Sequence, residues 1–546
     1  MVFMEQTFFC LLPPLLTIFL VFLTQNVMWS LVCGIFSAGF IAAKFSIFEG
    51  LMLIFKKIVA VLELQNLTSL HGLLQSEKLL LFLFLLVLGI VIALIAESGE
   101  GYGYVERLCE KLRTKAQAQL ACIFLSMTLF IDDYLNALIT SSVMRNLTDK
   151  FRIPRLKLAF LTTSMAAPFC SLAPISSWAA AIILVLFESG ISSNHASAII
   201  LGDPFVVFTK AIPFFFFSVF LILSVIFILV TGVSYGIIGL HETVAEAGEA
   251  NLFGGLHHPP AGGLAVDACK KLAVHSSFNF FSPLVVLSLG IFLAMLFTGD
   301  FFSQGVSLIA SLTAAKAELS LLLGVLLGLF YTLTLFFVQQ KITSTDALRA
   351  VKDGVMMMKD SLVVLALAWT LASFMRQDLG TGKYLAQILM PFLSREFLPF
   401  SVFLIAGTIS FAIGSAWATM AVIFPMVIPM VVEFSGAVAP AAIQSVSLVY
   451  PVIGAVISGA VFGSSMSPIA DLLVITSKNT QVNHFEYVKA QMQYLLPVGT
   501  GAALSFAIAG IFSNNFGYAS LFLVSIVPGL LVSFGFLLTL NFLQKN

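Results

Sequence analysis

The sequence has few charged residues. Asp, Glu, Lys and Arg make up 10% of its 546 residues, whereas hydrophobic residues make up 59%. Soluble domains carry about 25% charged residues, so a soluble fold is excluded and the lipid bilayer is the expected partner of most of the surface. Acidic and basic residues number 27 each. With no excess of positive charge, no nucleic-acid partner is expected.

Motifs of catalysis and cofactor binding are also missing. The sequence contains no phosphate-binding glycine loop, no nucleophile elbow and no HExxH, which argues against an ATP-driven pump and an intramembrane zinc protease. Six cysteines are scattered without the spacing of metal ligands or a disulfide framework. We therefore expect a protein that is not an enzyme and holds no cofactor. The first apolar run, from Leu11, lacks the features of a signal peptide and is predicted to be a span.

Apolar runs of a length that crosses a bilayer recur along the whole chain. Because backbone groups in lipid must be paired internally, these runs predict helices. We predict an all-α polytopic membrane protein with about 11 transmembrane helices and two re-entrant hairpins in an inverted-repeat arrangement. The expected parts are a first repeat at 1–240, a cytoplasmic loop at 241–278, and a second repeat with the C-terminal spans at 279–546.

The first hairpin is predicted at about 119–144, from the charges on either side of it. Basic residues cluster in Arg107–Lys115 and again in Arg145–Lys157. A single span between them would place two strongly basic loops on opposite sides of the membrane, which the positive-inside rule disfavours. A hairpin keeps both loops cytoplasmic and places its tip, near Asp132–Asp133, at mid-membrane.

Two long helices are predicted to be broken, one in each repeat. The first, at 156–187, is interrupted at Ala173–Ser177, and the second, at 441–477, at Ser467–Asp471. A second hairpin is predicted at about 398–432, around a polar interruption after Gly414. If the two hairpins open to opposite sides, the halves are inverted repeats and the transport site lies where the tips meet.

Asp132 and Asp133 are the strongest functional candidates. A carboxylate inside an apolar segment costs roughly 2.5–3.5 kcal/mol on insertion scales, so it is rarely kept without a role. Two adjacent carboxylates also favour sharing a proton, which could be the exchanged one. The structural alternative is that one Asp pairs with Arg145 or caps a hairpin arm. Asn136 lies within one helical turn of the pair.

Sodium prefers oxygen ligands, which broken helices and hydroxyl side chains supply. The predicted ion- or substrate-binding residues are Asp132, Asp133, Asn136, Ser176, Ser177, Ser415, Thr419, Ser467 and Asp471, of which Asp132, Asp133 and Asp471 are the sodium candidates. Other roles remain open for several of them. Asp471 can hydrogen-bond the break in its own helix, and the hydroxyls commonly join helices. For Trp178 and Trp417, packing is the favoured role.

Several segments resemble a known family. They are FIDDYLNALITSSVMRNLTDKFRIPRLKLAFL, the AAP and SSW segments that follow, GSAWATMAVIFPM, GAVFGSSMSPIADLLVITS and the opening LLPPLL. Taken in their order along the chain, roughly from Leu11 to Pro497, these segments resemble those of NhaC-type sodium/proton antiporters. The resemblance implies a secondary transporter of the bacterial inner membrane, with a scaffold, a transport module and paired re-entrant hairpins.

The sequence departs from that family at two places. Thr163 stands where members typically carry Asp, and Ser464–Ser465 where they typically carry Asp-His. Both changes remove titratable groups, so they bear on proton coupling and ion choice. The leading hypothesis is sodium/proton antiport, with an ion-coupled organic-acid or amino-acid transporter or exchanger as the alternative. A homodimer is also left open, because Gly324-x3-Gly328 is a pattern that allows close helix approach.

Overall fold

The computed structural model describes the chain except residues 1–7, 25, 64, 66–71, 73–75, 101–111, 175, 194–197, 248–276, 305–310, 312–314, 382–383, 385–386, 389–393, 469 and 546. Most of the predicted cytoplasmic loop at 241–278 lies outside the described residues.

The elements of the first part of the chain are mostly helices that start after a polar cap or a turn. Their bounds are Phe8–Leu11 (3₁₀), α1 Leu12–Thr24, α2 Val27–Ala42, α3 Ile47–Val61, α5 Glu77–Glu97, α7 Lys115–Thr128, α8 Asp133–Lys150, α9 Arg155–Leu172, α10 Ser177–Glu188, β1 Ile191–Ser192, β2 Ile200–Leu201, α11 Pro204–Ala211, Ile212–Phe214 (3₁₀), α12 Phe216–Thr231 and α13 Gly236–Ala247.

The remaining elements are also mostly helices, and the last two, α24 and α25, have 28 residues each. Their bounds are α14 Ser277–Thr298, α15 Phe301–Gln304, α17 Ala317–Val338, α18 Ser344–Ser373, the π-helical Phe374–Asp378, Arg395–Phe397 (3₁₀), α20 Leu398–Ile413, α21 Ala416–Phe434, β3 Ala441–Ala442, Ile443–Ser445 (3₁₀), α22 Val449–Ser464, α23 Asp471–Thr480, α24 His484–Ile511 and α25 Tyr518–Lys545.

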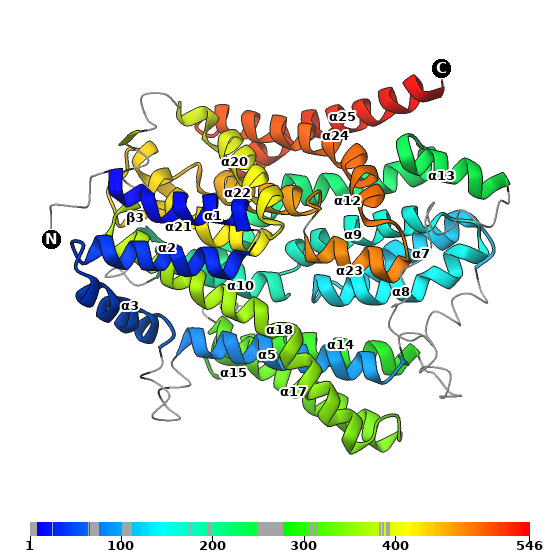
Figure 1. Cartoon of the computed structure of the whole chain (residues 1–546), viewed down its shortest axis with the longest axis horizontal. Helices are drawn as coiled ribbons and strands as arrows, with labels where there is room; N and C mark the ends of the chain where they lie inside the picture. Colours follow the sequence, from blue (N-terminus) through cyan, green and yellow to red (C-terminus); the bar gives the residue numbers. More distant parts are fainter. Residues whose placement is uncertain are drawn as a thin grey trace.

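The long helices run in roughly the same direction (Figure 1). In that view, α5, α14 and α17 lie along the lower edge and α24 and α25 along the upper edge. Between them, α7, α8, α9 and α23 occupy the right side, and α20, α21 and α22 the left. The strands pair in parallel in the order β1-β2-β3, which ties the chain after α10 to the chain before α22.

The prediction of an all-α polytopic membrane protein is confirmed. Among the described residues, seven helices are long and apolar enough to cross a membrane, or up to nine if each of two bent pairs is one span. Only three two-residue strands interrupt the helical pattern within those residues. The total of about 11 transmembrane helices and the inverted repeat stay predictions.

Two helix pairs reverse direction through short turns. Helices α7 and α8 fold back on each other, since the Asn136 side-chain amide of α8 donates to the Ser126 carbonyl of α7 at 2.7 Å. Helix α20 ends at Gly414, whose φ of +73° lies in the left-handed region that glycine adopts without strain. Whether these pairs are re-entrant in a membrane stays a prediction, and the segments Arg395–Ala412 and Ala416–Phe434 are each long and apolar enough to be a span.

Two further helices are interrupted close to the centre of the molecule. Helix α9 ends at Leu172 and α10 begins at Ser177, with a bend of 51° between them. Helix α22 ends at Ser464 and α23 begins at Asp471. These interruptions bring four helix ends into the interior, where the candidate site lies.

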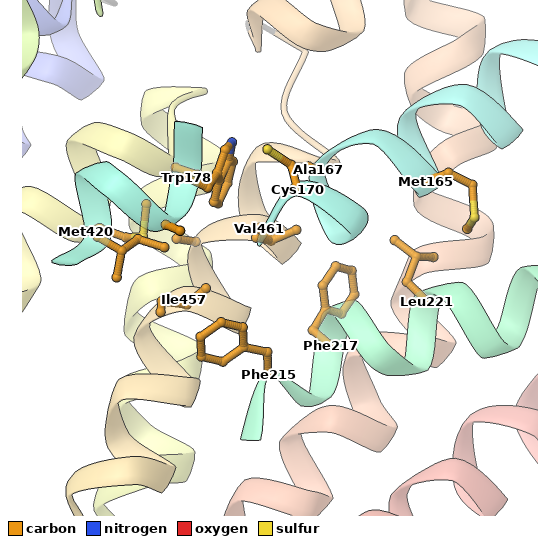
Figure 2. Packing of buried hydrophobic residues seen from close by; sticks show 14 of the residues in the cluster. Met165, Ala167, Cys170, Trp178, Phe215, Phe217, Leu221, Met420, Ile457 and Val461 are labelled. Carbon is orange, nitrogen blue, oxygen red and sulfur yellow. The ribbon is translucent and has the colours of Figure 1, made fainter. Parts of the chain in front are cut away.

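The core beside these interruptions is tightly filled. Figure 2 shows Trp178 and Cys170 facing Val461 and Ile457 of α22, with Phe217 of α12 below them. All five side chains are buried. Because interiors of this density tolerate little change in volume, this packing holds the broken helices in place.

Close helix contacts explain two small-residue patterns. A Cβ added at Gly324 would lie 2.4 Å from the Ile291 backbone nitrogen of α14, so the Gly324-x3-Gly328 face packs within the chain. Similarly, a Cβ at Gly463 would lie 2.1 Å from the Gly407 carbonyl oxygen of α20. Glycine is required at both positions because backbones approach directly.

Candidate functional site

A small cavity lies where the two hairpin turns meet the two helix breaks. Its volume is about 30 Å³. The residues that line it are Asp133, Tyr134, Ala167, Trp178, Gly414, Ser415, Ala416, Trp417, Ser464, Ser465, Ala470, Asp471, Leu472 and Leu473. These come from α8, α9, α10, α21, α22 and α23 and the turns between them. The cavity therefore joins both halves of the sequence.

Four helix N-termini converge on this cavity. Helices α8, α10, α21 and α23 begin at Asp133, Ser177, Ala416 and Asp471, and the first turn of each contributes to the lining. Each N-terminus carries roughly half a positive charge. Asp133 and Asp471 stand in the first turns of α8 and α23, where this partial positive charge favours a carboxylate.

The lining is acidic. Asp133 and Asp471 are its two acidic side chains, and no Lys, Arg or His is among the described residues that line it. Asp133 is buried, whereas Asp471 is exposed, so the cavity is not sealed. A cavity with two carboxylates and hydroxyl groups attracts a small cation that prefers oxygen ligands.

Asp132 lies directly behind the lining. Its Oδ2 accepts a hydrogen bond of 3.0 Å from the Ser177 hydroxyl, and the Ser177 amide donates to the Ile131 carbonyl at 2.8 Å. The turn between α7 and α8 is thereby attached to the start of α10. The predicted pair Asp132 and Ser177 is brought together, one residue away from Asp133.

Two of the serines that were predicted to bind the ion or substrate, Ser176 and Ser415, cap helix N-termini at the site. Ser176 Oγ accepts from the Ala179 amide at 3.0 Å, and Ser415 Oγ accepts from the Ala418 amide at 3.4 Å. This is the ordinary role of serine before a helix, because its oxygen pairs with an otherwise free amide. Ser415 also lines the cavity, whereas Ser176 lies outside the lining.

Three other predicted residues lie outside the lining. The Asn136 amide is used at both ends inside the first helix pair, donating to Ser126 O at 2.7 Å and accepting from Thr140 Oγ1 at 3.2 Å. Thr419 Oγ1 donates to the Ser415 carbonyl at 2.9 Å. Ser467 is buried in the break before α23. These positions shape the helix ends around the cavity.

Trp178 and Trp417 were assigned to packing, and the structure gives them a further place. Both line the cavity, and their ring centroids lie 4.8 Å apart. The Trp178 indole nitrogen is buried and makes no hydrogen bond within the described part of the chain, although the ring lies near the Asp133 carboxyl. Tyr134 also lines the cavity. The feature of the sequence that could have indicated this is a tryptophan two residues after each capping serine: Trp178 after Ser176, and Trp417 after Ser415.

The two departures noted in the sequence lie in different surroundings. Ser464 and Ser465 line the cavity at the end of α22. Thr163 is buried in α9, outside the lining, where its hydroxyl pairs with the Tyr487 hydroxyl and donates to the Ala159 carbonyl at 3.2 Å. Thr163 therefore joins α9 to α24, whereas Ser464 and Ser465 contribute hydroxyl oxygens to the site.

Comparison with known proteins gives a match to the Na+/H+ antiporter family over residues 169–511. This range covers more than half of the chain. The chain belongs to the Na+/H+ antiporter family. The match includes Trp178, Ser415 and Asp471 and begins after Asp133. Members of this family are transporters. The finer resemblance to the NhaC type stays a prediction.

Individual proteins with which the chain shares similarity include one relative and two solved structures. An uncharacterized protein of Haemophilus influenzae is 26% identical over 515 residues, covering 93% of this chain and 92% of the relative. The YdaH transporter of Alcanivorax borkumensis is 15% identical, covering 85% of this chain and 88% of its own, with a TM-score of 0.43. MtrF of Neisseria gonorrhoeae, whose structure is described with a class of antimetabolite efflux pumps, is 12% identical, covering 89% and 94%, with a TM-score of 0.40.

Proposed function

We propose that this family member exchanges sodium for protons across the bacterial inner membrane. The observation that carries the proposal is that Asp133 and Asp471, from the two halves of the chain, line one small cavity without a basic residue among its described lining. In this proposal, sodium leaves the cell and protons enter as the hairpin-bearing part moves relative to the remaining helices. Lipid is the only partner that the proposal requires, and a homodimer is not part of it.

Competition for the same carboxylates provides the exchange. A cation binds to ionised carboxylates, and protonation of those groups removes the charge that holds it. Asp132 and Asp133 are adjacent and buried, so their mutual repulsion opposes both of them carrying a charge at the same time. A bound sodium or a bound proton relieves that repulsion, and alternation between the two couples the fluxes.

The size of the cavity supports the leading hypothesis over the alternative. About 30 Å³ accommodates a sodium ion with a small number of waters. An organic acid or amino acid needs more space, of the order of 300 Å³ for common ligand sites. One feature favours the alternative, because α10 and α21 have no acidic residue in their first turns and could bind a carboxylate.

Proteoliposomes that contain a pH-sensitive dye test the proposal. Sodium, lithium and potassium are added in turn to vesicles with the wild-type protein, Asp133→Asn, Asp471→Asn, or the control Asp353→Asn, which alters an exposed carboxylate on α18. We expect sodium to dissipate the pH gradient with the wild type and the control but not with Asp133→Asn. Absence of cation-driven proton movement, together with proton-coupled uptake of an organic acid, would establish the alternative.

A further inference from the structure

Helix α3, Ile47–Val61, turns away from the helix before it. Between α2 and α3 the chain bends by 119°, and the turn takes Lys44 and Phe45 into the left-handed region, with φ of +53° and +67°. In Figure 1, α2 runs beside the long helices, whereas α3 runs obliquely to them at the edge of the molecule. Its 15 residues extend about 22 Å at helical rise, which is less than the roughly 30 Å of the hydrocarbon core. By itself, α3 is therefore too short to cross a bilayer.

One side of α3 packs against the protein. The buried residues of the helix are Gly50, Ile54 and Val61, which share one side because they recur at helical spacing. A Cβ added at Gly39 of α2 would lie 2.4 Å from an Ile54 side-chain carbon, so the two helices touch along this side. The rest of the α3 surface is left to other surroundings.

A second side of α3 is apolar and exposed. Its residues recur at spacings of three and four, and they are Ile47, Phe48, Leu51, Met52 and Phe55. We call these five residues the apolar strip. Phe48 and Phe55 lie two helical turns apart and are 75% and 67% exposed. Apolar surface is favourably removed from water, and the acyl chains of a bilayer provide that environment around a membrane protein.

A third side of α3 is charged. Glu49 and Lys56 lie seven residues apart on this side, and both are exposed without an ion-pair partner in the described part of the chain. Lys56 is only two residues from Ile54, the middle of the helix. If α3 crossed the bilayer, the Lys56 backbone would lie about 3 Å from the midplane, where charged residues are rarely left. At the membrane surface both side chains stay in water, and Lys56 can approach lipid phosphates.

Lys57 attaches α3 to the end of α18. Its Nζ lies 2.6 Å from Asp378 Oδ2, donates to Gln377 Oε1 at 2.9 Å, and lies 5.3 Å from the centre of the Phe374 ring. The side chains of Lys57 and Asp378 are 12% and 25% exposed. This attachment fixes the rotation of α3 about its own axis. The apolar strip and the charged side therefore point in set directions.

We propose that α3 is an interfacial helix: it lies at the boundary between lipid headgroups and acyl chains, with the apolar strip in the acyl chains and Lys56 toward the phosphates. An apolar side next to a charged side is the pattern of a helix in the membrane plane. A second copy of the chain would have to cover both sides, whereas this boundary presents acyl chains and water next to each other. The chain then enters and leaves α3 on one face of the membrane, and α3 adds no crossing. The proposal does not depend on which ion is transported.

The wild-type protein in vesicles of phosphatidylcholine and phosphatidylglycerol provides the first test. A membrane-impermeant amine reagent is added, and the modified lysines are identified by mass spectrometry. We expect Lys56 to react from the water, whereas Lys57 is protected by Asp378. After unfolding in detergent, both should react, which shows that both are detectable. This measurement needs no substitution, so it stands even if a variant fails to fold.

Spin labels at single cysteines measure the depth of α3 in the same vesicles. The six native cysteines are replaced, and labels are placed in Phe48→Cys, Phe55→Cys, Glu49→Cys or Lys56→Cys. Access to oxygen and to a water-soluble nickel complex then gives the depth of each label. We expect both labels of the apolar strip about 5–10 Å below the phosphates, with the labels at Glu49 and Lys56 open to nickel.

Phe330→Cys and Phe337→Cys of α17 are the matched controls. These phenylalanines are also exposed and seven residues apart, but they lie in a helix long enough to span. Their labels should differ in depth by about 10 Å, because α17 crosses the membrane. A label at Phe55 near the midplane, together with an unreactive Lys56, would show that α3 spans and would overturn the proposal. Labels at Phe48 and Phe55 that are shielded from both oxygen and nickel would also overturn it, since protein would then cover the strip.

Discussion

The indole rings of Trp178 and Trp417 pack against each other, with centroids 4.8 Å apart and planes inclined by 49°. Trp178 stands in the first turn of α10 and Trp417 in the first turn of α21. Their contact joins helix N-termini from the two halves of the chain and forms one wall of the cavity. If one half moves relative to the other at this point, the two rings must separate. If the rings stay in contact, α10 and α21 must move together.

The first prediction concerns this pair. Trp178→Ala should lower the free energy of unfolding by about 3–5 kcal/mol, because a large, fully buried side chain is removed. Trp178→Phe, which keeps an aromatic ring, should cost less. Thermal unfolding in detergent measures both. Equal melting temperatures for the alanine variant and the wild type would show that the ring does not stabilise the junction.

A second prediction concerns the hydroxyl behind the site. Ser177→Ala removes the donor that lies 3.0 Å from Asp132 Oδ2. A hydrogen bond to a charged group contributes about 1.5–3 kcal/mol, so KM for sodium should rise at least about tenfold in the vesicle assay. Ser189→Ala is the control, since Ser189 is buried at the other end of α10 and donates only to Val185 among the described contacts. Similar kinetics for both variants would remove Asp132 from the site.

The ion pair between Lys157 and Glu242 yields a third prediction. Their atoms lie 2.7 Å apart, and their side chains are 8% and 10% exposed. Lys157→Met should cost about 3–5 kcal/mol, because it leaves a largely buried carboxylate with the Ser234 hydroxyl and the more distant Lys115, at 3.4 Å, as partners among the described residues. Adding Glu242→Gln should recover part of that loss. Melting temperatures of the two single variants and the double variant measure the coupling, and strictly additive effects would contradict it.

A fourth prediction compares two glycines. Gly463→Ala should destabilise the protein, because the new Cβ would lie 2.1 Å from the Gly407 carbonyl oxygen and force α22 away from α20. Gly535→Ala places its Cβ in open space within α25 and should raise stability by about 0.5–1 kcal/mol, because alanine is the better helix former. Thermal unfolding distinguishes the two. If Gly463→Ala unfolds at the wild-type temperature, α22 and α20 are not held in this contact.

Composition was sufficient to predict the class of fold. A chain with 10% charged residues cannot cover a soluble surface, and the helices that were expected from the apolar runs are present. Ser176 and Ser415, which were predicted as ion- or substrate-binding residues, cap α10 and α21 through their own side chains. Such features depend on residues within one turn, which the sequence places together directly.

The composition of the site could be predicted only in part. Asp133, Ser415 and Asp471 do meet at one cavity, but Asn136 and Thr419 are used inside their own helices or helix pairs. A buried polar side chain must find a partner, and the sequence does not say whether that partner is a ligand or a neighbouring carbonyl. The two tryptophans were undervalued because packing and lining are compatible roles for one ring.

The sequence by itself determined that this is a membrane protein with carboxylates in apolar segments and with broken helices. Tertiary structure alone decided that four helix N-termini from both halves converge, that Trp178 meets Trp417, and that His484 reaches Pro468. The physical reason is distance along the chain. Hydropathy and capping act over a few residues, whereas contacts between remote helix ends arise from how the whole interior is packed.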